Sequence, residues 1–146
     1  MVSILCCIIF FNFLPLDVKG QAIRDKDRWG QSLLYVDGNT LRKKDKWGEK
    51  LFYFDGSTIR SEDKWGEKLF YINGNEVRYE DKWGAKYLYF DELTVKEEDR
   101  WGKKLFYLSG QQLRIEDKWG EPVYWLETIP EKWVIVCLVY LYNKMY

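Results

Sequence analysis

Short blocks of alternating apolar and polar residues recur along the chain every 18 residues, from about residue 20 to residue 126. Each unit contains two six-residue blocks rich in aromatic and β-branched side chains, such as Glu67 to Ile72 and Asn75 to Glu80. Alternation with a period of two and this composition are typical of β-strands. The array opens with a half repeat at Gln21, and the pattern predicts about twelve antiparallel strands in tandem hairpins.

Two different turn signals separate the blocks. Asn73-Gly74 predicts a two-residue type I′ hairpin turn, which needs positive φ angles. Asp63-Lys64-Trp65-Gly66 predicts a type I turn that the aspartate caps and that a left-handed glycine closes. Two strands and these two turns account for all 18 residues of a unit.

The register follows from the turn lengths. The Asn73-Gly74 turn would place Ile72 opposite Asn75 and Phe70 opposite Val77. The four-residue turn would place the same valine opposite the residue that corresponds to Phe70 in the next unit. We therefore expect one register at both turns and a continuous antiparallel meander.

The period of two divides the side chains between two faces. One face is apolar and is the expected core; in the second, third and fifth units it comprises Phe52, Phe54, Ile59, Phe70, Ile72, Val77, Phe106, Leu108 and Leu113. The other face places leucines and tyrosines beside arginines: Leu51, Tyr53, Arg60, Leu69, Tyr71, Arg78, Leu105, Tyr107 and Arg114.

A flat meander of twelve strands would expose two sheet edges, so the array over residues 21–127 is expected to close into an all-β barrel or flower-like ring. Twelve strands enclose more space than their own side chains fill, which calls for a plug. Residues 128–146 are the candidate. Thr128 has capping-box spacing to Glu131, and Trp133 to Tyr142 are apolar on every side.

A helix of about 14 residues would be roughly 21 Å long, which is shorter than the ~30 Å hydrocarbon layer of a bilayer. This length favours a short buried helix over a transmembrane one. A β-branched terminal strand is the alternative.

Residues 1–20 resemble a secretory signal peptide. Ile4 to Leu16 are almost wholly apolar, and Val18-Lys19-Gly20 provides a cleavage site after Gly20. The alternative is that Phe13 to Val18 form an extra strand in the repeat register. The signal would make the protein secreted or membrane-associated; without it, the protein would be cytoplasmic.

Charge and composition limit the chemistry. Basic and acidic residues number 23 each, so the net charge is zero, which argues against nucleic-acid binding. The chain contains no histidine, and its cysteines, Cys6, Cys7 and Cys137, have no metal-binding spacing. We expect no cofactor, no metal site and no catalytic residues.

Residues 20 to 126 resemble the β-flower hairpin-repeat proteins. The resemblance rests on tandem hairpins with glycine-containing turns, on Asp-Gly turns and on strands such as Glu121-Pro122-Val123-Tyr124. It implies a shallow symmetric barrel like the Tubby C-terminal domain, with twelve strands around a C-terminal apolar helix, and it implies lipid or membrane association. Six copies, rather than the four of some flower proteins, leave the symmetry open. The hairpins also resemble cell-wall choline-binding repeats.

The candidate site is a ring of six tryptophans, each preceded by a lysine or arginine. We call these residues the tryptophan rim: Arg28, Trp29, Lys46, Trp47, Lys64, Trp65, Lys82, Trp83, Arg100, Trp101, Lys118 and Trp119. Indoles beside cations are typical of surfaces that settle at lipid headgroups, and indoles can also stack on sugars or hold a quaternary ammonium. The alternative is that each indole packs over a neighbouring strand.

Other repeated polar residues have structural explanations. A row formed by Arg24, Arg42, Arg60, Arg78, Lys96 and Arg114 could bind an anionic headgroup, or it could pair with acidic neighbours such as Glu62, Glu80, Glu98 and Glu116. The six turn aspartates are explained by capping. In the fourth unit Asp91-Glu92-Leu93 replaces the Asp-Gly turn, which predicts a positive φ at Glu92.

The functional expectation is a non-enzymatic module that binds a lipid, a membrane surface or an apolar small molecule. A secreted carbohydrate-binding or cell-wall-binding repeat protein is the second hypothesis, and a purely structural repeat domain is the third. The sequence leaves the oligomeric state open.

Overall fold

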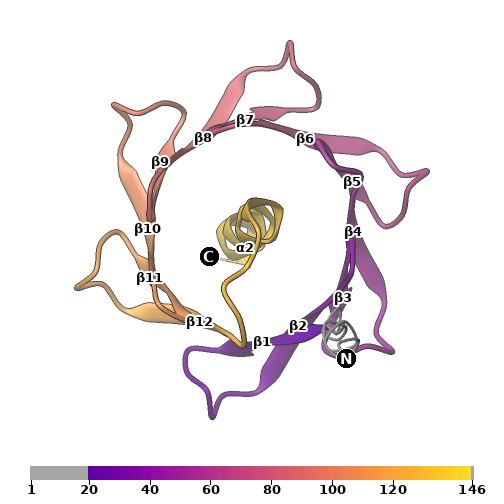
Figure 1. Cartoon of the computed structure of the whole chain (residues 1–146), viewed down its shortest axis with the longest axis vertical. Coiled ribbons are helices and arrows are strands. Elements are labelled where there is room, and N and C mark those ends of the chain that lie inside the picture. The colour runs from indigo at the N-terminus through magenta and orange to yellow at the C-terminus, as the bar shows by residue number, and fades with distance from the viewer. Residues whose placement is uncertain (1–19, 146) are drawn as a thin grey trace, which may run out of the picture.

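The computed structural model describes residues 20–145. Within them, twelve antiparallel strands form a closed barrel around one helix (Figure 1). This confirms the all-β hairpin-repeat fold, its strand number and its closure. The strands are β1 Gln21–Asp25, β2 Ser32–Asp37, β3 Thr40–Lys43, β4 Lys50–Phe54, β5 Thr58–Ser61, β6 Lys68–Asn73, β7 Glu76–Tyr79, β8 Lys86–Asp91, β9 Thr94–Glu97, β10 Lys104–Ser109, β11 Gln112–Ile115 and β12 Pro122–Leu126.

The helix α2, Lys132–Met145, fills the barrel as expected. It begins at Lys132, so the expected start at the Thr128 capping box is wrong; the Thr128 N–H instead donates to Gln21 Oε1. Trp133 to Val139 are all buried among the inward side chains of the strands. In residues 20–145 no helix is both long and apolar enough to cross a membrane.

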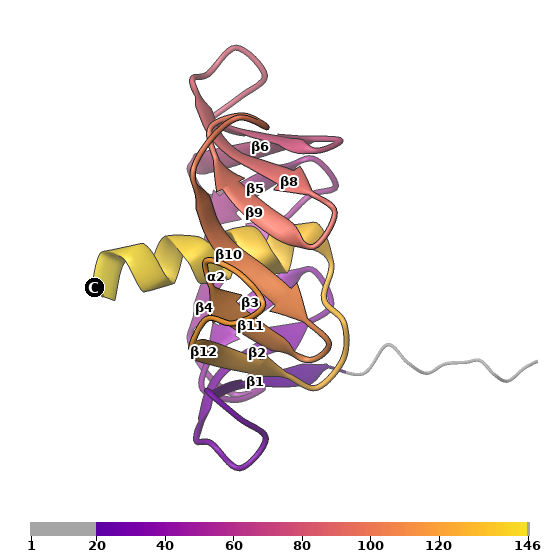
Figure 2. The ribbon, with the colours of Figure 1, turned by 90° about the vertical axis from the view of Figure 1, so that its left-hand side faces the viewer.

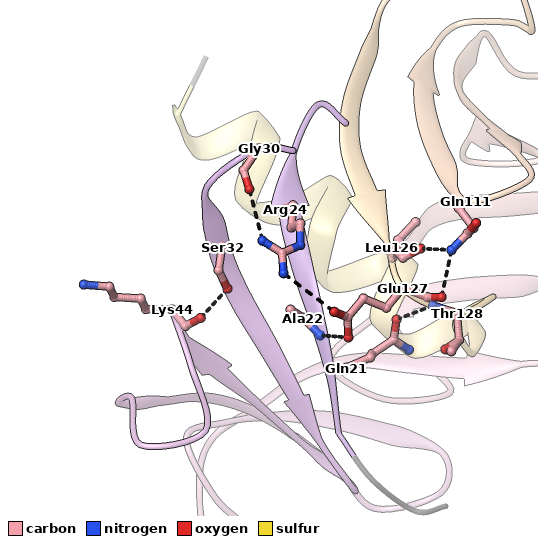
Figure 3. Close-up of polar contacts among 10 residues, drawn as sticks. All are labelled: Gln21, Ala22, Arg24, Gly30, Ser32, Lys44, Gln111, Leu126, Glu127 and Thr128. Carbon is pink, nitrogen blue, oxygen red and sulfur yellow. Dashed lines mark hydrogen bonds and ion pairs between the residues drawn. The ribbon is translucent and has the colours of Figure 1, made fainter. Parts of the chain in front are cut away.

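The barrel closes by completing a hairpin from the two ends of the array. Ile23 of β1 pairs with Leu126 of β12, in the register that Val77 and Ile72 have within a continuous unit. No turn connects β12 to β1, and hydrogen bonds from side chains link the two ends of the array instead (Figure 3). Glu127 Oε1 accepts the Ala22 N–H at 2.9 Å, and Gln111 Nε2 donates to the carbonyl of Glu127 at 2.8 Å. The opening half repeat is therefore what closes the ring.

The expected single register is wrong. Val77 does lie opposite Leu88, the counterpart of Phe70 in the next unit, but its partner in β6 is Ile72 rather than Phe70. The pairing thus shifts by two residues with every unit. A closed barrel requires such a stagger because its strands must tilt.

A β-bulge accompanies each two-residue shift, and it changes the face of the sheet on which one residue per unit lies. Ile59 pairs with Phe70, whereas Arg60 pairs with Lys68, so Leu69 is an extra residue in its strand. Leu69 packs against the core instead of lying outside beside Tyr71. The same correction applies to the equivalent leucines, Leu51 and Leu105. The remaining core residues of the prediction are buried or packed against the core.

The hairpin turn is also displaced from its predicted position. Asn73 pairs with Glu76, so the two turn residues are Gly74 and Asn75, and of these Gly74 has a positive φ of 65°. A two-residue turn with positive φ at its first position is of the type II′ kind, so the type I′ prediction is wrong. At the same position in the fourth unit, Glu92 has a φ of 56°, which confirms the predicted strain.

Glu92→Gly should therefore stabilise the protein. A left-handed conformation costs an L-residue about 1 kcal/mol or more, and glycine avoids this cost. Urea unfolding of Glu92→Gly should show a free energy of unfolding about 1 kcal/mol higher. Gly74→Glu is the matched reverse change and should lower it by a similar amount. Equal stability of wild type and Glu92→Gly would contradict the strain.

Candidate functional site: the tryptophan rim and the barrel mouth

Each tryptophan lies in a tight turn that repeats six times with nearly the same geometry. In the third turn the Trp65 N–H donates to Asp63 Oδ1, and the Gly66 N–H donates to the Asp63 carbonyl, both at 2.9 Å. The capping role of the aspartates and the type I turn are as predicted. The equivalent aspartates are Asp27, Asp45, Asp81, Asp99 and Asp117.

The positive φ lies before the aspartate rather than at the glycine, which corrects the prediction for this turn. Glu62 has a φ of 67°, and the Asp63 N–H donates to the Ser61 carbonyl across it, forming a γ-turn of the strained type. Glycine is needed at position 66 for another reason. A Cβ there would lie 1.6 Å from the Ser61 carbonyl oxygen.

All six turns project outward (Figure 1) from one end of the barrel (Figure 2), at the connections that follow β1, β3, β5, β7, β9 and β11. Their indoles are 81–82% exposed. The alternative that they pack over neighbouring strands is therefore wrong. The cation before each indole lies over its ring, at 4.8–5.3 Å from the centroid. The structure thus presents the tryptophan rim as six equivalent indole–cation pairs.

The arginine row holds these turns in place from the outer face of the barrel. Each arginine donates from Nη1 to the carbonyl of the turn glycine six residues later, at 2.8–3.2 Å: Arg24 to Gly30, Arg42 to Gly48, Arg60 to Gly66, Arg78 to Gly84 and Arg114 to Gly120. Lys96 donates to the Arg100 carbonyl instead. The row supports the tryptophan turns and is not a free anion site.

The acidic partners of this row differ from those expected. Within residues 20–145 the ion pairs are Arg24–Glu127, Arg42–Asp37, Arg60–Asp55, Arg78–Glu76 and Lys96–Asp91. The expected partners Glu62, Glu80, Glu98 and Glu116 are instead the positive-φ residues of the tryptophan turns.

The pKa of Asp55 is lowered by its hydrogen bonds. Burial tends to raise this pKa, but hydrogen bonds from the Thr58 and Ser57 N–H groups and from Arg60 outweigh the effect of burial.

Charge breaks the symmetry of the six turns. The positive-φ residue is a lysine in the first two turns, Lys26 and Lys44, and a glutamate in the other four. Because an aspartate and a cation follow in every turn, the first two turns are the more basic ones. This basic third of the rim lies at the start of the array, beside β1 to β4.

The last turns of α2 extend beyond the barrel at the same end as the tryptophan turns (Figure 2). Inside this mouth, aromatic rings of the helix contact strands on two sides, since Tyr142 lies 5.4 Å from Phe106 of β10, across the ring from β4. The Tyr140 ring lies 5.2 Å from Phe70 and 5.9 Å from Phe52. Phe70 in turn stacks on Tyr87, which contacts Tyr79 at 4.7 Å. The Tyr79 and Tyr87 side chains therefore fill the mouth beside β7 and β8.

Two cavities open on the opposite side of the mouth, near β1 and β2. One, of about 350 Å³, is lined by Leu33, Leu34, Lys43, Glu49, Leu51, Tyr124, Leu141 and Met145. The other, of about 210 Å³, is lined by Asp25, Lys26, Leu33, Ile115, Glu121, Pro122, Val123, Tyr124, Tyr142 and Met145. Leu33, Tyr124 and Met145 line both, so the cavities adjoin. Sequence reasoning missed this mouth, although Leu34, at a position that is phenylalanine or tyrosine in four of the six units, is a signal for it.

The tyrosine cluster should give the protein a stability change at alkaline pH. Burial, and then the neighbouring Tyr79, raises the pKa of Tyr87 to about 12, although a hydrogen bond with Asn143 lowers it. The value in an unfolded chain is about 10, so the folded state favours the neutral phenol. The free energy of unfolding should therefore be retained below pH ~10 and decline as the pH rises toward ~12.

Tyr87→Phe should make this decline shallower in urea unfolding experiments across that pH range. Tyr53→Phe, on the outer face, is the control and should leave the decline as it is in wild type. The same pH profile in Tyr87→Phe and wild type would contradict the assignment.

Residues 20–145 offer neither an activated cysteine nor a metal-binding cluster. The Cys137 thiol is fully buried, and burial raises its pKa well above the usual value, which disfavours the nucleophilic thiolate. Residues 20–145 contain no group of three or more acidic, cysteine or histidine side chains placed to hold a metal ion. The predicted signal peptide, with Cys6 and Cys7, lies outside the described residues except for Gly20.

Comparison of the chain with protein-family models, with curated proteins and with solved structures found no match. The resemblances to β-flower and choline-binding repeats therefore stay hypotheses.

Proposed function

We propose that this protein is a non-enzymatic module that binds a membrane surface through the tryptophan rim. The observation that carries the proposal is the exposure of all six rim indoles, at 81–82%. Indole is large and amphipathic, and it partitions to the headgroup region of a bilayer. Six indoles around one end of a rigid barrel would engage a surface together, which multiplies weak individual contacts.

The charges of the rim support an indole-driven contact rather than an electrostatic one. Each cation lies over its own indole, and every turn also carries an aspartate. The whole chain has no net charge. Salt and anionic lipid should therefore alter the affinity for vesicles only modestly, in contrast to polybasic segments. Repetition also supports a binding role, since a catalytic site needs different groups in different roles.

Sedimentation with vesicles tests the proposal. Wild type should sediment with vesicles of neutral lipid and with vesicles containing anionic lipid. A variant with all six rim tryptophans replaced by alanine should stay in the supernatant, and variants with one to three replacements should lose affinity stepwise. Trp125→Phe, outside the rim, is the control and should bind like wild type. Binding of the six-alanine variant, or no binding by wild type, would contradict the proposal.

A carbohydrate surface is the second candidate, because the cation covers one face of each indole and the other face is exposed to solvent. An indole face of this kind can stack on a sugar ring. Retention on insoluble polysaccharide together with no sedimentation on vesicles would favour this candidate over the membrane.

A further inference from the structure

The cavities at the barrel mouth have an identifiable origin. Around the ring, the inward position occupied by Phe70 in β6 is also aromatic in β4, β10 and β12, but it is a leucine in β2 and β8, Leu34 and Leu88. On the far side Tyr87 replaces the leucine found at its position in four other units. Toward Leu33 and Leu34 the helix presents Leu141 and Met145 in the wall of the larger cavity, so space is left beside β2.

The larger cavity has the properties of a site for one hydrocarbon chain. Its volume of about 350 Å³ lies at the small end of the ~300–1,000 Å³ range of ligand sites. Its wall includes the apolar side chains of Leu33, Leu34, Leu51 and Leu141. An apolar cavity of this kind favours an aliphatic chain over water.

The charged residues at the mouth indicate the head of such a ligand. Lys43 lines the larger cavity and Lys26 lines the smaller one. Neither lysine is in one of the ion pairs found in residues 20–145. Asp25, Glu49 and Glu121 also line the mouth, which disfavours a head with several negative charges.

We infer that the mouth beside β2 binds a single-chain amphiphile with one negative charge, with its chain between Leu33 and Leu141 and its head near Lys43 and Lys26. A fatty-acid carboxylate and a monoacyl lipid whose only charge is a phosphodiester share this chemistry. The inference goes beyond membrane docking because this site lies inside the barrel mouth and uses none of the rim indoles.

Calorimetric titration without vesicles, using amphiphiles below their micelle concentration, tests the site. Affinity for saturated fatty acids should rise about fourfold per added methylene until the cavity is filled and then level off. Monoacyl phosphodiesters of the same chain length separate the two head chemistries. Binding that does not saturate, or that is independent of chain length, would overturn the inference.

Matched variants locate the chain. Leu33→Phe fills both cavities and should weaken binding at least about tenfold. Leu105→Phe places the same residue at the equivalent position of β10, away from the cavities, and should bind like wild type. Thermal unfolding verifies that both variants fold. Equal binding by both variants would place the ligand elsewhere.

Charge variants locate the head. Lys26→Glu and Lys43→Glu introduce residues that the repeat already carries at these positions, in Glu62 and Glu97, so the fold should tolerate them. Together they should weaken binding of the anionic amphiphile about tenfold, with little effect on a neutral alcohol of the same chain. An equal loss for both ligands would contradict the placement of the head.

The two proposals fail independently of each other. The six-alanine rim variant should still bind the monomeric amphiphile but should not sediment with vesicles. Leu33→Phe should show the opposite pattern. If wild type binds vesicles but no amphiphile below the micelle concentration, only the mouth site is wrong.

Discussion

Replacing Trp133 with alanine is expected to lower the free energy of unfolding by about 3–5 kcal/mol, the range for truncating a large buried aromatic residue. Trp133 is 1% exposed, stacks on Phe54 with ring centroids 5.5 Å apart and donates its indole N–H to Glu131 Oε1 at 2.7 Å. Its loss would leave a cavity between the helix and the barrel wall and one carboxylate without its partner.

Trp65→Ala is the matched comparison within the same protein. Because the Trp65 side chain is 82% exposed, this substitution should change the stability by less than about 0.5 kcal/mol. Urea unfolding, followed by circular dichroism, measures both variants. A large loss of stability in Trp65→Ala would show that the rim indoles contribute to packing, against the exposed geometry.

Gly66→Ala should also be severely destabilising, by about 3 kcal/mol or more. The added Cβ would lie 1.6 Å from the Ser61 carbonyl oxygen, so the backbone of the turn has to move. That movement would also break the hydrogen bond from Arg60 to the Gly66 carbonyl. Glycine is therefore required here by close approach and not by its φ angle.

Gly74→Ala provides the contrast for this prediction. A Cβ on Gly74 meets nothing within 4 Å, but the φ of 65° is left-handed. The expected cost is about 1 kcal/mol, from backbone strain alone. Denaturant unfolding of both variants should rank Gly66→Ala as the more damaging, and equal losses would contradict the difference between the two turns.

The fold could be predicted from the sequence because its strongest signals are periodic. The unbroken 18-residue spacing requires equivalent units, and a meander of about twelve strands has exposed edges unless it closes. The half repeat that begins at Gln21 is recognisable in the sequence. In the structure its strand β1 pairs with β12 and closes the barrel. The apolar segment after residue 131 had no other place to be buried.

The register could not be predicted because the 18 residues of a unit can be divided in more than one way. Assigning the turn to Asn73-Gly74 rather than Gly74-Asn75 moves every partner in the hairpin by two residues. A bulge at Leu69 and at the equivalent positions then turns one residue per unit inward, and no single residue in the repeat marks it.

The candidate site was only partly predictable. The spacing places the six tryptophans at equivalent turns, but it does not say whether an indole in a turn packs or projects. In the structure the indole of Trp65 projects into solvent, because it lies at the tip of the short Asp63–Gly66 turn. The barrel mouth depends on differences between units, such as Leu34 against Phe70, which a search for repetition overlooks.

Depth-dependent fluorescence quenching tests the central claim most directly, because it reports where the rim indoles lie in the bound state. The chain has eight tryptophans, six of them in the rim, while Trp133 is buried. In vesicles whose acyl chains are brominated near the headgroups, most of the emission should be quenched and the emission of Trp133 should remain. Unquenched emission from protein that sediments with the vesicles would contradict the claim that the tryptophan rim is the membrane-binding surface.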